Sequence, residues 1–334
     1  MPRVVRCLAV IALACASVPV AALDPPSPPT DAALLAPIVV SGEQPGPGLW
    51  KVTRDGRVLW ILGSLTPLPR DMTWVSREVE ATIATSQEVI LPVDVDLSVK
   101  GGAIGGLFLL PSLLGARNNP DGRTLDEVIP TELYARWSVL KKKYLGRDAG
   151  VEKRRPIFAA FELFEAAIKQ AGLDNASVVE PVIKRAAKRA KVTVTRPRIE
   201  LKLDKARATV KAFAQTPLDD LDCLRKTIER LEGDLTILQK RANAWAVGDV
   251  EALVTLAYVD QNKSCRDALL RSALAEERGM DALPARVMQT WLDAAEQALS
   301  TRTSTFATLP IGALTAADGY LDALRARGAE VEAP

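Results

Sequence analysis

Residues 49–64, with the sequence LWKVTRDGRVLWILGS, decide how the fold begins. Two apolar runs, Leu49–Val52 and Val58–Leu62, lie on either side of the pair Asp55-Gly56. An Asp-Gly pair between apolar runs favours a two-residue turn, because both of its positions adopt positive φ readily. The stretch therefore predicts a β-hairpin at the start of the folded region.

The segments next to this hairpin and at the end of the chain have an α/β pattern. Trp74–Ser86 has apolar residues at helical spacing, and Glu88–Val95 has the character of a buried strand. The C-terminal segment predicts a strand at Ser304–Leu309, a helix at Asp318–Ala326 and an edge strand at Ala329–Glu332.

Helical patterns dominate the residues between these two segments. The clearest covers Leu218–Trp245, whose apolar residues recur at steps of three and four and predict one long amphipathic helix. The other expected helices are Asp126–Lys143, Pro156–Ala171, Ser177–Ala190, Leu203–Ala214, Ser264–Glu277 and Ala285–Ala298. We therefore expect a single α/β domain over residues 49–334, with a central mixed β-sheet formed by the N- and C-terminal segments and a large helical insertion.

The longest apolar run after the N-terminal residues is Ala103–Leu114. It contains Gly105, Gly106 and Pro111, which favours a buried or lid-like segment over a membrane span. The glycine-rich stretch Gly101–Gly106 lacks the lysine and hydroxyl partner of a phosphate-binding loop, so a flexible turn is expected there.

The N-terminus has the pattern of an export signal. Arg3 and Arg6 precede the apolar stretch Cys7–Ala22, and residues 23–48 are a proline-rich leader. Lipid attachment at Cys15 is the less favoured alternative, because the apolar run continues past this residue. The expected product is periplasmic or secreted, without a transmembrane segment once residues 1–22 are removed.

Two cysteines remain after the signal, Cys223 and Cys265. An even pair in an oxidising compartment favours a disulfide, with two buried thiols as the alternative. The formal net charge of the chain is +2, which predicts neither nucleic-acid nor membrane binding from bulk electrostatics.

The chain of 334 residues contains no histidine. Histidine is the side chain that titrates near neutral pH and the commonest metal ligand. The usual Ser-His triads and zinc sites therefore cannot be assembled, and two thiols alone do not complete a metal site. We expect no metal and no cofactor.

Three parts of the sequence keep a characteristic order and spacing. They are the opening with Leu49–Val52, Leu59–Gly63, Pro67 and Trp74, the Trp-x-x-Gly-Asp step at Trp245–Asp249, and the closing segment Asp318–Gly328. Together they resemble the TraB/GumN family over about Leu49–Glu332. The resemblance implies an α/β fold similar to the Tiki metalloproteases and erythromycin esterase. It also implies a site with two Gly-x-x-His motifs and acidic residues from neighbouring strands.

This sequence departs from that site pattern. The first Gly-x-x-His maps to Gly63 and Thr66, the second to Pro310 and Ala313, and the two acidic positions to Pro92 and Pro197. Threonine, alanine and proline supply neither imidazole nor carboxylate. The resemblance therefore implies an inherited fold without the family's metal chemistry.

The leading hypothesis is an exported, catalytically inactive binding or interaction module of the cell envelope, with an envelope protein or an anionic polymer as partner. The alternative is a hydrolase of the peptidase or esterase class that uses Thr66, Asp94 and Arg286 in the same cleft.

A second alternative is a surface that binds anions or polysaccharides. Its residues would be four cations on one helical face, Lys184, Arg185, Lys188 and Arg189. A solvated helix face is the ordinary interpretation of such a run. Few aromatic residues lie among these cations, so no nucleic-acid binding is expected.

Overall fold

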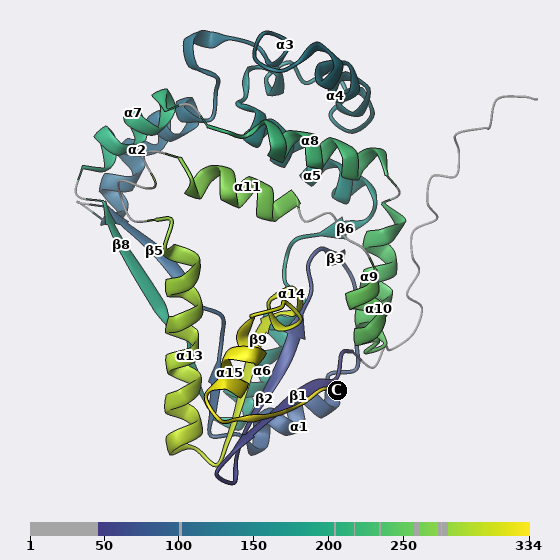
Figure 1. Cartoon of the computed structure of the whole chain (residues 1–334), viewed down its shortest axis with the longest axis vertical. Coiled ribbons are helices and arrows are strands. Elements are labelled where there is room, and N and C mark those ends of the chain that lie inside the picture. The colour runs from purple at the N-terminus through teal and green to yellow at the C-terminus, as the bar shows by residue number, and fades with distance from the viewer. Residues whose placement is uncertain are drawn as a thin grey trace, which may run out of the picture. The chain divides into compact units, whose positions relative to one another are not determined.

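A computed structural model describes residues 46–99, 102–203, 205–216, 218–233, 235–256, 261–272, 275 and 280–334. All of them belong to one compact unit, Pro37–Pro334. The predictions for residues 1–22, for Cys15 and for most of the leader concern residues outside the described part of the chain. The described elements form a part built on a six-stranded sheet and a part built from helices (Figure 1).

The chain begins with the expected hairpin. Strand β1 (Leu49–Arg54) pairs antiparallel with β2 (Arg57–Ser64), and the turn between them has positive φ at Asp55 (49°) and Gly56 (74°). Both turn residues thus adopt the left-handed conformation that this residue pair favours. The prediction from residues 49–64 is confirmed.

The main sheet has the strand order β10-β1-β2-β9-β4-β7. The remaining four strands are β4 (Glu88–Ile90), β7 (Thr193–Thr195), β9 (Ser304–Pro310) and β10 (Glu330–Glu332). Strands β2, β9, β4 and β7 are parallel, whereas β1 is antiparallel to β2 and β10. Because the C-terminal strand β9 lies between β2 and β4, the two ends of the domain together form one mixed sheet, as predicted.

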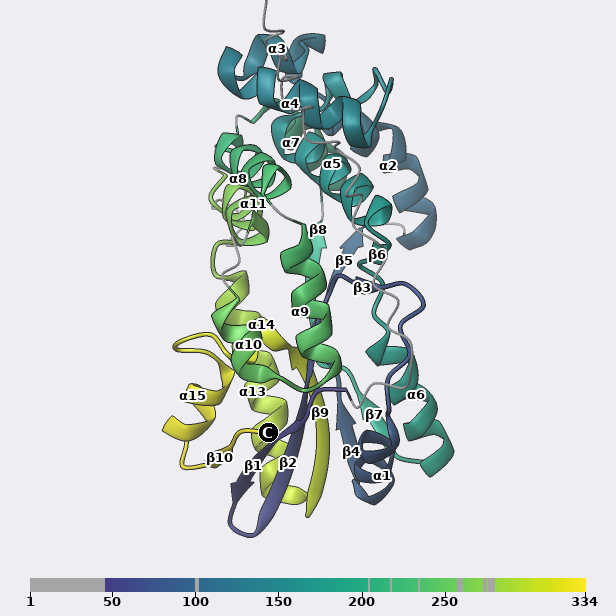
Figure 2. The ribbon, with the colours of Figure 1, turned by 90° about the vertical axis from the view of Figure 1, so that its right-hand side faces the viewer.

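Helices cover the two sides of this sheet. They are α1 (Arg77–Thr85), α6 (Val179–Ala190), α13 (Leu283–Thr301), α14 (Ile311–Leu314) and α15 (Tyr320–Ala326). Figure 2 shows α13 and α15 on one side of the sheet and α1 and α6 on the other. The core between these layers contains the fully buried side chains of Leu59, Ile61, Trp291 and Phe306.

The helical part has a second core. It contains α3 (Leu125–Val128), α4 (Thr131–Tyr144), α5 (Pro156–Gln170), α8 (Leu221–Glu232) and α11 (Gln261–Leu270). Trp137, Leu163 and Leu224 are fully buried there. A disulfide joins Cys223 of α8 to Cys265 of α11, with the two Cα atoms 4.6 Å apart. The predicted cysteine pairing is confirmed.

The prediction of one helix over Leu218–Trp245 is wrong. Helix α8 ends at Gly233, whose ψ of 177° is extended, and a separate helix α9 (Thr236–Ala246) follows. Glycine is the cheapest place to interrupt a helix, because it stabilises the helical backbone least after proline. The break lets α8 pack in the helical core while α9 carries Trp245 into the core at the sheet.

The expected turn at Gly101–Gly106 is also wrong, because residues 102–106 belong to helix α2 (Gly102–Ala116). This helix contacts α7 (Ala206–Gln215) and strand β5 (Asp94–Val99), which pairs with β8 (Arg198–Leu203). The expectation of a buried segment fails at Phe108, which is 73% exposed. Within the described part of the chain, no helix combines the length and apolar character needed to cross a bilayer.

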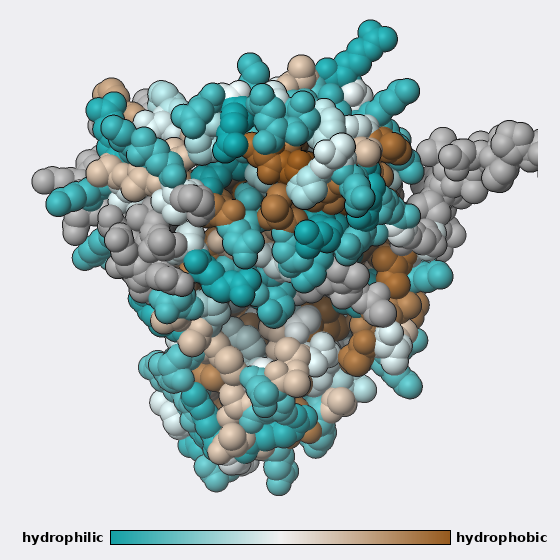
Figure 3. Space-filling model, turned by 45° about the horizontal axis from the view of Figure 1, so that its top comes forward, coloured by the Kyte–Doolittle hydropathy of each residue, from teal (hydrophilic) through white to brown (hydrophobic). Residues whose placement is uncertain are grey.

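The shorter elements complete the chain. They are β3 (Leu68–Pro69), β6 (Leu173–Asp174), α10 (Val250–Thr255) and two 3-10 turns at Pro120–Gly122 and Val151–Lys153. Hydrophilic side chains cover most of the face drawn in Figure 3, and hydrophobic ones gather in separate patches.

Candidate functional site

A cavity of about 640 Å³ lies at the C-terminal ends of the parallel strands β2 and β9. We call it the strand-end pocket. Its lining residues are Ser64, Leu65, Thr66, Pro67, Leu238, Arg241, Lys263, Arg266, Pro310, Ile311, Gly312, Ala313 and Ala316. Figure 1 shows helix α11 above α14 at these strand ends and α9 beside it. The carboxyl ends of parallel strands are the usual ligand-binding edge of an α/β sheet.

The pocket contains both positions that map to the family's histidines. Thr66 follows β2 and is exposed, and Ala313 lies in the short helix α14 after β9. Strands β2 and β9 are paired through Gly63↔Leu309 and Ser64↔Pro310, so the two loops leave the sheet side by side. The two mapped positions therefore lie on neighbouring loops. Both loops line a cavity, and the space between them is not filled by a packed core.

Gly63 has a packing role at the base of this pocket. A Cβ atom at this position would lie 3.0 Å from Cζ3 of Trp50 and 3.1 Å from Cδ1 of Ile311. The carbonyl oxygen of Gly63 accepts a 2.9 Å hydrogen bond from Nε1 of the buried Trp245. These contacts explain a glycine here without reference to catalysis.

The Trp-x-x-Gly-Asp step is likewise structural. Trp245 packs edge-on against Trp74, with ring centroids 5.7 Å apart. Gly248 has a φ of 75°, which glycine adopts at little cost, and it ends helix α9. Asp249 then caps helix α10, because its Oδ1 accepts a 2.8 Å hydrogen bond from the backbone N–H of Ala252. The step joins α9 to α10 and fixes Trp245 beneath the pocket.

The two prolines at the mapped acidic positions lie where two strand pairs are interrupted. The parallel pair β4/β7 ends at Ile90↔Thr195, and the pair β5/β8 begins at Asp94↔Arg198. Between these pairs, the three residues 91–93 lie opposite the two residues 196–197. The segment that joins β4 to β5 therefore contains one extra residue, as in a β-bulge. Pro92 and Pro197 lack the backbone N–H that a continuous ladder needs. Neither proline is among the residues that line the strand-end pocket.

Three basic side chains line the pocket, and the sequence analysis did not single them out. Arg241 of α9 donates hydrogen bonds to the carbonyl oxygens of Leu253 (2.7 Å) and Leu256 (3.4 Å). Lys263 and Arg266 lie on α11, where Lys263 pairs with Asp267 at 2.9 Å. This hydrogen bond lowers the pKa of the Asp267 carboxyl group below its ordinary value. The described lining residues thus include three cations and no carboxylate, although Asp267 pairs with Lys263 from outside the lining.

The disulfide positions two of these cations. Cys265 lies between Lys263 and Arg266 in the sequence, and its bond to Cys223 holds α11 against α8. The sequence signal was the run Lys263–Arg266, in which the cysteine expected to pair is flanked by cations. Two of the three basic residues thus depend on the disulfide for their place.

The alternative catalytic residues are not all at the pocket. Thr66 lines it, whereas Asp94 is half-buried at the start of β5 and Arg286 is exposed in the first turn of α13. Among the described residues, no hydrogen bond joins these three side chains. The same residues contain no group of three or more His, Cys, Asp or Glu that could hold a metal ion. A catalytic role for Thr66, Asp94 and Arg286 remains a prediction.

The four cations of the second alternative lie on helix α6. Lys184 pairs with Glu180 at 2.7 Å, and Arg189 forms an ion pair with Glu80 of α1. Arg185 and Lys188 are exposed on the same helix. Part of the positive charge is therefore balanced by neighbouring carboxylates, as on an ordinary solvated helix face.

A comparison of the sequence with known protein families gives one match. The sequence model of the TraB/PrgY/gumN family matches residues 48–333. No curated protein and no solved structure gives a significant match to the chain. The match covers the main sheet, the helical part and the strand-end pocket, and it makes this chain a member of the TraB/PrgY/gumN family.

Proposed function

We propose that this chain is an exported, non-catalytic binding protein of the cell envelope, and that its strand-end pocket binds an anionic group such as a carboxylate or a phosphate. The observation that carries the proposal is the set of basic side chains at the pocket, Arg241, Lys263 and Arg266. They converge from two helices onto the loops where the family's histidines would lie.

The shape and chemistry of the pocket support a ligand of moderate size. Its volume of about 640 Å³ falls within the roughly 300–1,000 Å³ typical of small-molecule sites. Cations that line one concave wall raise the local concentration of anions, because a cleft with low-dielectric walls focuses their field. Gly312, Ala313 and Ala316 are small, so a ligand can approach the α14 backbone closely.

The absence of an imidazole from the sequence supports binding over hydrolysis. A threonine hydroxyl becomes an effective nucleophile only with a base beside it, and Thr66 has no basic group of suitable pKa among the described lining residues. The guanidinium and ammonium groups at the pocket carry only hydrogen-bond donors and no acceptor. They therefore attract anions but do not accept a proton from Thr66.

Two observations support an envelope location. Residues 1–22 have the sequence pattern of an export signal, and the Cys223–Cys265 pair is at disulfide distance. Disulfides persist in oxidising compartments outside the cytosol. The anionic polymers and small acids of the envelope are therefore the ligand class to test.

Titration calorimetry on the mature protein tests the proposal. The probes are a digalacturonate, inorganic pyrophosphate and the neutral disaccharide cellobiose. We expect at least one anionic probe to bind with an affinity that falls with added salt, and no binding of cellobiose. Arg266→Glu is expected to weaken anion binding by about tenfold or more, because it replaces attraction with repulsion.

Arg271→Glu is the matched control, since Arg271 is exposed just after the same helix and does not line the pocket. If both variants lost the same amount of anion affinity, the loss would reflect the change in net charge, and this would contradict a site in the pocket. Chelator-sensitive hydrolysis of peptide or ester substrates by the purified protein would contradict the non-catalytic assignment.

A further inference from the structure

Helix α2 exposes an unusual amount of apolar surface. Four of the nine large, exposed hydrophobic side chains among the described residues lie on it, namely Phe108 (73%), Leu110 (47%), Leu113 (44%) and Leu114 (57%). Leu110, Leu113 and Leu114 are spaced three and four residues apart, so they share one face of the helix. Leu109 and Ala116 are buried and attach the opposite side of the helix to the protein.

The exposed face is free of charge along its length. No Asp, Glu, Lys or Arg occurs between Gly101 and Ala116 in the sequence. Soluble surfaces rarely expose contiguous apolar patches of this kind unless they bind a partner or a membrane. The helix is therefore a candidate docking surface.

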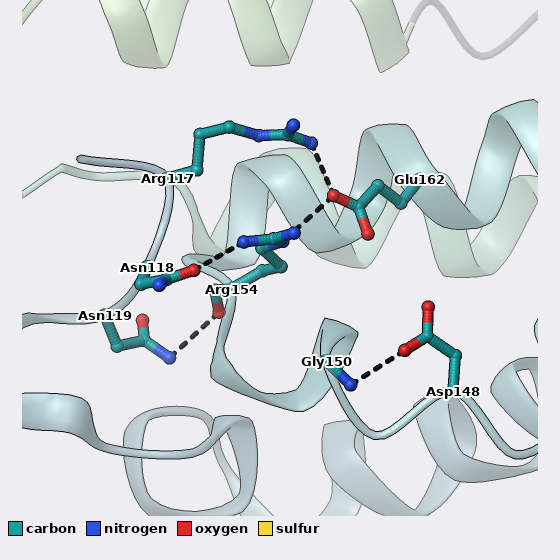
Figure 4. A network of polar contacts seen from close by, with 7 residues as sticks. All are labelled: Arg117, Asn118, Asn119, Asp148, Gly150, Arg154 and Glu162. Atoms are coloured by element: carbon teal, nitrogen blue, oxygen red, sulfur yellow. Dashed lines mark hydrogen bonds and ion pairs between the residues drawn. The ribbon is translucent and has the colours of Figure 1, made fainter. Parts of the chain in front are cut away.

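A polar network fixes the C-terminal end of α2 (Figure 4). Arg117 forms an ion pair with Glu162 of α5, and Arg154 bonds to the same carboxylate at 3.0 Å. Arg154 also donates to Oδ1 of Asn118 at 2.6 Å, and Asn119 donates to the Arg154 carbonyl oxygen at 2.9 Å. The residues after α2 are thus anchored to the helical part, and the apolar face is held outward.

The neighbouring helix α7 adds positive charge to this surface. Helices α2 and α7 pack against each other, and Lys205, Arg207 and Lys211 of the α7 segment are exposed. Residues 205–216 contain no acidic side chain. In the described residues, no ion pair is formed by Lys205, Arg207 or Lys211. An uncharged apolar helix therefore lies beside a helix that carries only cations.

We propose that these two helices form a docking surface for a bilayer of anionic phospholipid. We call this the α2/α7 surface, with Leu110, Leu113, Leu114, Lys205, Arg207 and Lys211 as its members. The apolar side chains would enter the boundary between headgroups and acyl chains, and the α7 cations would bind the anionic headgroups. Helix α2 has 15 residues, which suits a helix that lies in the interface rather than one that spans the bilayer.

Charge favours a lipid surface over a second copy of the chain. A symmetric dimer through α2 would bring the cations of two α7 helices toward each other, and like charges at an interface disfavour association. An anionic bilayer instead attracts these cations, and it needs no shape complementarity to accept the three leucine side chains. The proposal rests on local charge, so it is compatible with the overall formal charge of +2.

Vesicle flotation with the mature protein tests the proposal. Vesicles of phosphatidylethanolamine with phosphatidylglycerol are compared with vesicles of phosphatidylcholine. We expect flotation with the anionic vesicles only. Leu110→Ser/Leu114→Ser and Arg207→Gln/Lys211→Gln are each expected to lower the vesicle-bound fraction, the first by roughly tenfold and the second in a salt-dependent way.

The controls change the same residue types elsewhere. Val139→Ser/Val247→Ser removes two exposed apolar side chains, and Lys142→Gln/Lys143→Gln removes two exposed cations of α4. Both controls are expected to float like the unmodified protein. The changed positions are exposed, and circular dichroism confirms that each variant is folded.

Two results would overturn the proposal. One is failure of the unmodified protein to float with anionic vesicles. The other is a dimer, seen by sedimentation velocity, that Leu110→Ser/Leu114→Ser converts to monomer while vesicle binding is unaffected, because this would identify a second copy as the occupant. The strand-end pocket plays no part in either readout, so the two proposals fail or succeed independently.

Discussion

The sheet part and the helical part of this molecule differ in what they keep of the family pattern. At the sheet, motif residues such as Gly63, Trp245 and Gly248 have clear packing roles, and Thr66 and Ala313, to which we map the family's histidines, line the strand-end pocket. The helical part contributes Lys263, Arg266 and the disulfide that positions them. Packing therefore accounts for the motif residues at the sheet, while the helical part supplies the cations on which the proposed anion binding rests.

The largest expected effect tests the structural role of the family motif. Trp245→Ala removes a fully buried side chain and leaves the Gly63 carbonyl oxygen without its donor. We expect the free energy of unfolding to fall by roughly 5 kcal/mol, the upper range for a buried Trp→Ala change. Urea unfolding followed by circular dichroism measures it. Val247→Ala, at an exposed position two residues later, is the control; an equal loss there would refute a special role for Trp245.

The disulfide is expected to have the next largest effect. Cys223 and Cys265 are separated by 42 positions, so their bond restricts the unfolded chain by about 4 kcal/mol on a loop-entropy estimate. Cys223→Ser/Cys265→Ser is expected to lose most of this stabilisation. The variant is also expected to bind anions more weakly, because α11 carries two of the pocket cations. Unfolding and calorimetry on the same variant separate the two effects. Unchanged anion binding would show that α11 keeps its place without the bond.

Gly63→Ala tests whether close packing explains the glycine at this position. The added methyl group would crowd Trp50 and Ile311, and overpacking of this kind costs roughly 1–3 kcal/mol. Gly312→Ala is the matched control, because nothing lies within 4 Å of its added Cβ. We expect a lower midpoint of thermal unfolding for the first variant only. Equal midpoints for both would contradict the packing explanation of Gly63.

The smallest effect concerns a buried pair in the helical part. Burial raises the pKa of the Asp220 carboxyl group, and burial lowers the pKa of Arg155. A carboxyl group with a raised folded-state pKa binds its proton more tightly in the folded state. Its contribution to stability therefore falls as pH rises from its ordinary pKa through the raised value.

Asp220→Asn removes this titration but keeps an oxygen for the backbone N–H of Ile157. The free energy of unfolding of the variant minus that of the unmodified protein should therefore increase from pH 4 to pH 7. Urea unfolding at several pH values measures the difference. A constant difference would contradict a raised pKa of Asp220 in the folded state.

Much of the fold was predictable because its signals are local. Asp55-Gly56 specifies the hairpin turn, and the apolar run at Ser304–Leu309 specifies β9, which completes the sheet. The long-helix prediction failed because the apolar stripe continues through Gly233, so periodicity does not reveal the break. The run Ala103–Leu114 predicted a buried or lid-like segment, but apolar composition alone does not distinguish a buried helix from one that exposes Phe108 and Leu114.

The candidate site was predictable only in part. The mapped segments Gly63–Thr66 and Pro310–Ala313 lie side by side, because strand pairing brings both loops to one edge. The cations Arg241, Lys263 and Arg266 were missed because each lies on a helix whose place depends on tertiary packing and, for α11, on the disulfide. Residues that converge from separate helices leave no joint pattern in the sequence.

Anomalous diffraction distinguishes an anion site from a metal site at the strand-end pocket. Crystals of the mature protein are soaked separately with selenate and with zinc, and anomalous diffraction locates each ion. The account predicts a selenate peak in the strand-end pocket beside Arg241, Lys263 and Arg266, and no zinc peak between Thr66 and Ala313. A zinc ion bound there, with no selenate in the pocket, would contradict it.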